Sequence, residues 1–149
     1  MYQEDEQVQI DLRLIRIWIK ASKTIYDLIV EDIKRHELSV ENFMILEFLY
    51  NKGPHTIQKI SEQLSIPSGS ITYVVDKLEK KGCIKREKNP TDRRSCNAVL
   101  TKDGQNLFKE IFPEHVKVLS EILSPLDNEE KVQLTELLKK LGLGANQLR

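Results

Sequence analysis

The chain has 149 residues, of which 40% are hydrophobic and 31% charged, and its basic and acidic residues balance to a net charge of zero. This length suits one domain with a substantial core, and the composition is that of an ordinary globular protein. No apolar run reaches the roughly 18 residues that suggest a membrane span, and the acidic, polar N-terminus is unlike a secretory signal. We therefore expect a cytoplasmic protein without a membrane partner.

The charge is unevenly distributed along the chain. Residues 68–102 contain nine Lys or Arg and four Asp or Glu residues, a formal charge of +5, so the remainder carries −5. A basic region on an acidic body suits a protein that contacts phosphates with one face. A charged surface that is merely solvated is the alternative interpretation.

Two helices are predicted before the basic region. Residues 8–35 carry apolar side chains at helical spacing without Gly or Pro, and because these cover more than one face, more than one side needs burial. The next helix begins after Ser39, a suitable N-cap, and ends at Gly53-Pro54.

The segment from Thr56 to Thr101 has the layout helix, turn, helix and β-hairpin. Its second helix has Ile71, Val74, Val75 and Leu78 on one stripe and is stopped by Gly82, and strand-like runs at 84–88 and 95–100 flank a polar loop. This layout is typical of a winged helix-turn-helix that binds DNA. The predicted fold is mainly α with a small β-hairpin wing.

A polar face lies opposite the buried stripe of the second helix. Hydroxyl groups there can bond phosphates or base edges, and lysines can reach the sugar-phosphate backbone. Two adjacent arginines at a hairpin tip suit a narrow minor groove. The candidate DNA-binding residues are Ser68, Gly69, Ser70, Thr72, Tyr73, Lys77, Lys80, Arg93 and Arg94.

Asp76 lies on the same face, where a carboxylate opposes phosphate unless a cation neutralises it. We predict an ion pair with Arg86, Arg93 or Arg94 that positions the arginine. Asp92, in the loop, either accepts hydrogen bonds from backbone N–H groups or braces Arg94.

Together these residues resemble the signature of the MarR family of bacterial regulators: Thr72, Asp76, Leu78, Glu79, Gly82 and Arg86, then Asp92-Arg93-Arg94 and the exit Leu100-Thr101-Lys102-Asp103-Gly104. The resemblance covers nearly the whole chain. It implies a winged-helix homodimer, usually a repressor, on a pseudo-palindromic operator of double-stranded DNA. It further implies that the second motif helix enters the major groove and Arg94 the minor groove. The runs ITYVVDKLEKKG and FPEH are similar to a Gram-positive branch that responds to quinones and other aromatic electrophiles.

Two helices are expected after the wing. Pro113 should kink the first of them, and Asp127 or Asn128 caps the second, which Gly142 stops. The resemblance assigns dimerisation to residues 8–35 and 102–142, around a DNA-binding region at 39–101, in one unit spanning 1–149. An intramolecular bundle of these helices is the alternative.

The resemblance also implies a small phenolic or quinone-like ligand, bound between the dimer helices and the DNA-binding region. The candidate pocket residues are Trp18, Tyr26, His36, Phe108 and His115, each of which can instead be an ordinary core or surface residue. Cys83 and Cys96 are either reduced structural thiols or electrophile sensors, since nearby cations can lower a thiol pKa. Peroxide-sensing members of the family carry their reactive cysteine in the first helix, where this chain has none.

The sequence gives no indication of an enzyme, a cofactor or a metal site. Phosphate-loop, zinc-protease and nucleophile-elbow motifs are absent, and the two cysteines lack zinc-ligand spacing. The alternative to a ligand-responsive regulator is a winged helix used as a protein-interaction module without ligand response.

Overall fold

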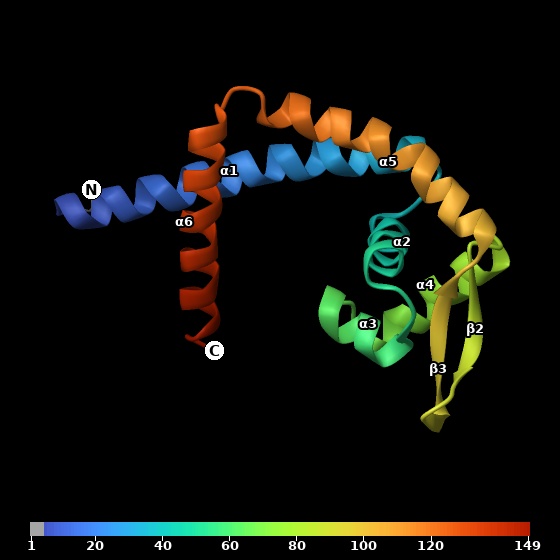
Figure 1. The fold of residues 1–149 in the computed structure, drawn as a ribbon. Helices are drawn as coiled ribbons and strands as arrows, with labels where there is room; N and C mark the ends of the chain where they lie inside the picture. Colours follow the sequence, from blue (N-terminus) through green and yellow to red (C-terminus); the bar gives the residue numbers. More distant parts are fainter. Residues whose placement is uncertain (1–4) are drawn as a thin grey trace. The chain divides into compact units, whose positions relative to one another are not determined.

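The computed structural model describes residues 5–149. In this range the elements follow in the order α1 (Glu6–Arg35), α2 (Val40–Lys52), β1 (His55–Thr56), α3 (Ile57–Leu64), α4 (Ser68–Lys80), β2 (Ile84–Asn89), β3 (Asp92–Leu100), α5 (Lys102–Leu123) and α6 (Asn128–Asn146) (Figure 1). The predicted fold class, mainly α with a small β-hairpin wing, is confirmed. The chain divides into two compact units, one ending at His115 and the other comprising Val116–Arg149.

The helix caps predicted at Ser39 and Asp127 are present, and Thr56 forms a further one. The Ser39 and Thr56 hydroxyls each accept a hydrogen bond at 3.1 Å from the backbone N–H three residues further on. Asp127 accepts from the Glu130 N–H at 2.8 Å, and the Glu130 carboxylate accepts in return from the Asp127 N–H. Because the first turn of a helix leaves its N–H groups unpaired, these side chains fix where α2, α3 and α6 begin.

The turn between α3 and α4 runs from Ser65 to Pro67. Ser65 has a left-handed φ of 54° and ends α3, and the Ser61 hydroxyl donates to the Ile66 carbonyl. Pro67 lies one residue before α4, in extended conformation. This position suits proline, because its fixed φ starts the helix without requiring a donor.

The core of the first unit is formed by α2, α3, α4, the sheet and the beginning of α5. Its least exposed side chains, all below 2%, are Ile45, Leu46, Ile60, Val75, Leu78, Ile84 and Phe108. α5 approaches the start of β2 so closely that a Cβ on Gly104 would lie 2.0 Å from the Cys83 carbonyl oxygen. Only glycine fits there, and the wing is thereby packed directly against the first turn of α5.

In the described residues, three antiparallel strands form a sheet in the order β1-β3-β2. The hairpin pairs Ile84 with Leu100 and continues to Lys88 opposite Cys96. β1 was not predicted. In it His55 pairs with Ala98 and is half-buried. The sequence does not reveal this strand, because two residues are too few to show an alternating pattern.

α6 is longer than predicted. Gly142 was expected to stop it, but the helix continues to Asn146. A glycine ends a helix when it adopts positive φ, and among the described residues the positive-φ glycines are Gly53, which caps α2, and Gly82, two residues after the end of α4. Inside a helix, glycine only weakens it, by about 1 kcal/mol relative to Ala.

Two helices leave many apolar side chains exposed. In α1 they are Ile10, Leu14, Ile15, Ile17, Trp18, Ile19, Ile25, Tyr26 and Leu28, and in α6 they are Val132, Leu134, Leu137, Leu141 and Leu143. α1 buries only Asp32 and Ile33, and α6 buries none of its residues. Exposed apolar faces of this size are typical of helices whose apolar side is suited to packing against another surface.

Candidate nucleic-acid interface

α4 separates a buried stripe from an exposed polar face. Ile71, Val74, Val75 and Leu78 are buried as predicted. The predicted contact residues on this helix are all exposed, namely Ser68, Gly69, Ser70, Thr72, Tyr73, Lys77 and Lys80. The Lys77 ammonium lies 4.8 Å from the centroid of the Tyr73 ring, so the tyrosine helps to position this cation.

Arg86 connects the wing to α4. Its guanidinium nitrogens lie 2.6 Å from Asp76 Oδ1 and 2.9 Å from Glu79 Oε1. The hydrogen bond to Asp76 is the main reason that the pKa of Arg86 is raised, with Glu79 adding to it against the effect of burial. Of the three arginines considered as partners for Asp76, the structure therefore selects Arg86. Glu79 was not predicted to take part, although its spacing of i, i+3 from Asp76 places both carboxylates on one helix face.

The tip of the wing is ordered by its own side chains. Asp92 Oδ1 accepts from the Arg94 backbone N–H at 2.9 Å, the first of the two roles considered for it. Asn89 Oδ1 accepts from the Thr91 N–H at 3.0 Å. Arg93 and Arg94 are exposed at the start of β3, which begins at Asp92, three residues before the predicted strand. In the described part of the chain neither arginine has an ion-pair partner, so both charges are available to phosphates.

Within the described residues, no single cavity is lined by all five residues predicted for the ligand pocket, although the Phe43 ring lies beside both Phe108 and His115. Phe108 is a core residue at 1% exposure, whereas Trp18 is 41% exposed on α1. His115 is buried with its Nδ1 atom 2.7 Å from Asp32 Oδ2. His36 Nε2 lies 3.8 Å from a Glu114 carboxylate oxygen. Of the five, Tyr26 alone lines the cavity described next.

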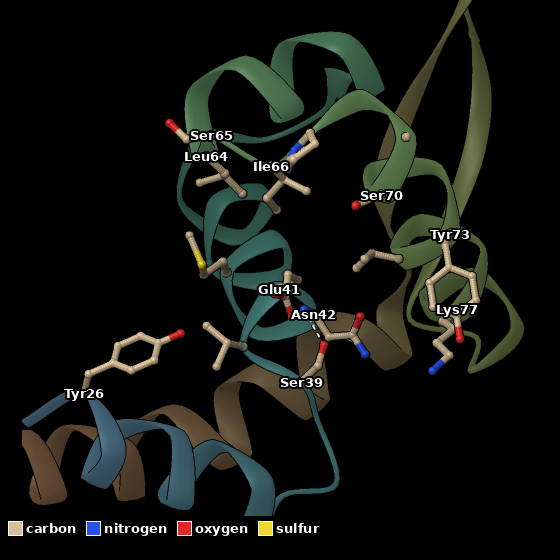
Figure 2. A pocket seen from close by; sticks show the side chains of 15 residues that line it. Tyr26, Ser39, Glu41, Asn42, Leu64, Ser65, Ile66, Ser70, Tyr73 and Lys77 are labelled. Carbon is tan, nitrogen blue, oxygen red and sulfur yellow. Dashed lines mark hydrogen bonds between the residues drawn. The ribbon is translucent and has the colours of Figure 1, made fainter. Parts of the chain in front are cut away.

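A groove of about 600 Å³ lies within the first unit, between the start of α2, the α3–α4 turn and α4 (Figure 2). We call it the α2–α4 groove. It is lined by Tyr26, Ser39, Val40, Glu41, Asn42, Met44, Leu64, Ser65, Ile66, Pro67, Gly69, Ser70, Tyr73, Val74 and Lys77. Most of these are missed by sequence reasoning, because positions from separate helices meet only in the folded chain.

The two cysteines differ in environment. Cys83 is buried, and burial raises the pKa of its thiol, with Asp103 acting in the same direction and Lys81 opposing it. A raised pKa keeps the group in the unreactive thiol form, which counts against Cys83 as an electrophile sensor. Cys96 is exposed on β3, opposite Lys88.

Residues 5–149 contain no cluster of three or more His, Cys, Asp or Glu side chains that could hold a metal ion. None of the helices in this range is both long enough and apolar enough to cross a membrane. The geometry that remains is a helix-turn-helix whose exposed face carries hydroxyl and ammonium groups, tied through Arg86 to a basic hairpin. Fold and site together define a winged-helix protein of the nucleic-acid-binding class.

Comparison with known proteins gives the family. The MarR family profile matches residues 38–96. The transcriptional regulator MhqR of Bacillus subtilis is 42% identical over 136 residues, which cover 91% of this chain and 94% of MhqR. The chain therefore belongs to the MarR family of transcriptional regulators, which are DNA-binding proteins and not enzymes.

Solved structures agree on the fold. AbsC, a MarR family regulator from Streptomyces coelicolor, superposes with a TM-score of 0.83 at 17% identity, and 99% of each chain is covered. A point mutant of Escherichia coli MarR, solved in complex with operator DNA, superposes with a TM-score of 0.77 at 24% identity, covering 93% of this chain and 99% of that one.

Proposed function

We propose that this protein is a homodimeric repressor that binds a pseudo-palindromic operator and releases it when a small phenolic or quinone-like ligand binds. α4 lies in the major groove, with Ser68, Gly69, Ser70, Thr72, Tyr73, Lys77 and Lys80 toward the duplex. Arg93 and Arg94 at the wing tip reach the minor groove, where the negative potential is enhanced.

The contact between Arg86 and the two α4 carboxylates carries this proposal. A carboxylate on a phosphate-facing surface weakens binding unless a cation neutralises it. Arg86 pairs with both Asp76 and Glu79, at 2.6 and 2.9 Å, and offsets one of their two negative charges. The contact also fixes the hairpin relative to α4, so that helix and wing can engage one duplex at the same time.

Dimerisation is proposed from the exposed apolar faces of α1 and α6. Helices of this kind are stable when a second surface covers them, and a second copy of the chain supplies the same faces by symmetry. The proposed dimer frame is residues 8–35 and 102–142, extended to Asn146 by the observed end of α6. A two-fold dimer places two recognition helices about 34 Å apart, one turn of DNA, which matches a palindrome.

The comparisons support this proposal at two points. The chain matches nearly the whole length of MhqR, which is a transcriptional regulator. The E. coli MarR mutant that shares this fold was solved on operator DNA. A ligand releases DNA only if it binds better to a state that cannot hold the operator.

The test is a fluorescence-anisotropy titration on the DNA upstream of the protein's own gene, repeated across salt concentrations. Affinity should fall linearly on a log–log plot as salt rises, because phosphate contacts release counterions. Arg94→Ala should weaken binding by about tenfold or more, whereas Lys139→Ala, a cation of α6 outside the DNA-binding region, should not. A flat salt dependence, or full affinity in Arg94→Ala, would contradict the proposal.

A further inference from the structure

The Thr101 side chain lies where the wing ends and α5 begins, and its hydroxyl group makes two hydrogen bonds. It accepts from the Gly104 backbone N–H at 3.0 Å, which caps the first turn of α5. It donates to the carbonyl oxygen of Gly82, two residues after the end of α4, at 2.5 Å. The backbone N–H of Thr101 also donates to the Cys83 carbonyl at 3.0 Å. One residue therefore connects the end of α4, the start of the wing and α5 (Figure 1).

The Gly82 carbonyl that Thr101 meets is held in place by the way α4 ends. Gly82 has a φ of 79°. Its N–H donates to the Glu79 carbonyl, and the Cys83 N–H donates to the Leu78 carbonyl, both at 3.0 Å. This is the Schellman arrangement, which pairs the last carbonyl groups of a helix and sets the direction in which the chain leaves it. The hydroxyl of Thr101 thus binds an acceptor whose position α4 already fixes.

The wing amplifies any movement at this joint. β2 has six residues, from Ile84 to Asn89, which span about 20 Å at the usual rise of a strand. A rotation of about 10° at the base would therefore move the tip by about 3.5 Å, more than the length of a hydrogen bond. Arg93 and Arg94 lie near that tip, so where their side chains can reach depends on the angle at the base.

We propose that Thr101 is a positioning residue for DNA binding. Its hydroxyl group fixes the angle of the wing relative to α4, so that Arg93 and Arg94 reach the minor groove while α4 lies in the major groove. Arg86 holds the wing to α4 further along β2, through two partly exposed ion pairs. A hairpin that is also fixed at its base cannot pivot about that contact. The groove contacts rest on the proposed function, whereas the joint at Thr101 does not.

The first test examines the joint without DNA, by hydrogen exchange of the ¹⁵N-labelled full-length protein. The Gly104 N–H lies in the first turn of α5, where no carbonyl of the same helix can accept from it, so its protection reports the Thr101 hydroxyl. It should exchange slowly in the unaltered protein and in Thr101→Ser, which keeps the hydroxyl. In Thr101→Val, which has nearly the same shape without the hydroxyl, exchange should be about tenfold faster.

Thr135→Val is the matched control for this experiment. The hydroxyl of Thr135, on α6, likewise donates to a backbone carbonyl, that of Lys131, and its loss should leave exchange at Gly104 unchanged. Equal exchange at Gly104 in Thr101→Val and in the unaltered protein would overturn the joint.

The second test measures affinity for the operator at low salt by fluorescence anisotropy, with and without the change Arg93→Ala/Arg94→Ala. Thr101→Val should weaken binding by about fivefold when both arginines are present and by less than about 1.5-fold when they are gone, because a misplaced wing then has no contact to lose. Thr101→Ser should bind as the unaltered protein does. Damage to the fold would weaken binding equally in both backgrounds, and equal losses would overturn the positioning role.

Thr101→Asp separates the two hydrogen bonds of the hydroxyl. A carboxylate still accepts from the Gly104 N–H but has no proton to donate to the Gly82 carbonyl. Gly104 should therefore stay protected while operator affinity falls, and the loss should again require Arg93 and Arg94, whereas the added charge alone would act in both backgrounds. Unchanged affinity in Thr101→Asp would refute the role of the donated bond. Because this variant keeps the helix cap, it decides the question even if Thr101→Val does not fold.

These outcomes separate the joint from the proposed function. Failure of the unaltered protein to bind operator DNA would refute the proposed function and leave the exchange result in place. Full affinity of Arg93→Ala/Arg94→Ala would remove the minor-groove contact, and the positioning role with it. Full affinity of Thr101→Val in a protein whose wing arginines do contribute would refute the positioning role alone.

Discussion

The DNA-binding region buries its apolar residues, whereas the helices at the two ends of the chain expose theirs. Residues 39–101 bury theirs within the chain, on α2, α3, α4 and the sheet. α1 and α6 expose most of theirs. The same helical periodicity predicts burial in both regions. Only in residues 39–101 does the same chain supply the side chains that cover the apolar face.

Leu78→Ala gives the largest expected effect. Leu78 is fully buried on α4, and removing such a side chain costs about 2–5 kcal/mol through lost burial and the cavity left behind. Urea denaturation followed by circular dichroism should show this loss equally at every protein concentration. The matched change Leu137→Ala, at a residue 62% exposed on α6, should destabilise less and in a concentration-dependent way, because it weakens association. A concentration-independent loss in Leu137→Ala would instead support an intramolecular bundle.

Ile19→Asp tests the exposed face of α1 directly. Ile19 is 61% exposed, so a charge there is harmless in an isolated chain but would be desolvated in a dimer interface. Light scattering after gel filtration should show monomers where the unaltered protein forms dimers. Lys20→Asp, which introduces the same side chain at the neighbouring position and changes the charge by even more, is the control for an effect of charge. A dimer that persists in Ile19→Asp would place the interface elsewhere.

Asp76→Asn tests the contact between wing and helix. Operator affinity should fall by several-fold, because Arg86 loses one of two carboxylates, while stability should change by less than about 1 kcal/mol since the pair is partly exposed. Glu87→Gln removes the same charge from the wing, where Glu87 pairs with Lys85, and should leave affinity equal or tighter. Opposite signs in these two variants distinguish bracing from simple charge removal. Unchanged or tighter binding by Asp76→Asn would refute bracing.

The smallest expected effects concern the cysteines. Because burial raises the pKa of Cys83, less of it is thiolate at mildly alkaline pH than of an ordinary cysteine, so iodoacetamide should modify it much more slowly than Cys96. Mass spectrometry of the labelled chain measures both rates, and urea should remove the difference. Cys83→Ser and Cys96→Ser should still release the operator on adding ligand. Loss of release in either variant would restore thiol sensing.

Much of the site could be predicted because it depends on local patterns. The stripe Ile71, Val74, Val75 and Leu78 fixes which face of α4 is exposed, and this follows from the 3.6-residue period alone. Capping by Ser39, Thr56 and Asp127 is equally local, since each hydroxyl or carboxylate reaches only three residues along the chain. Which residues share a cavity could not be obtained this way. It required knowing which helices face each other, and the structure places Phe108 and His115 in the core and Trp18 on an exposed face.

The sequence by itself determined the helix-turn-helix, the wing and the polar face of α4, because spacing and turn chemistry act between neighbours along the chain. Only the tertiary structure decided that Arg86, rather than Arg93 or Arg94, pairs with Asp76, because the sequence pattern allowed any of the three arginines to do so. It also decided that Gly142 continues its helix and that the Thr101 hydroxyl meets the Gly82 carbonyl. These outcomes depend on distances between elements and on burial, which no local pattern encodes.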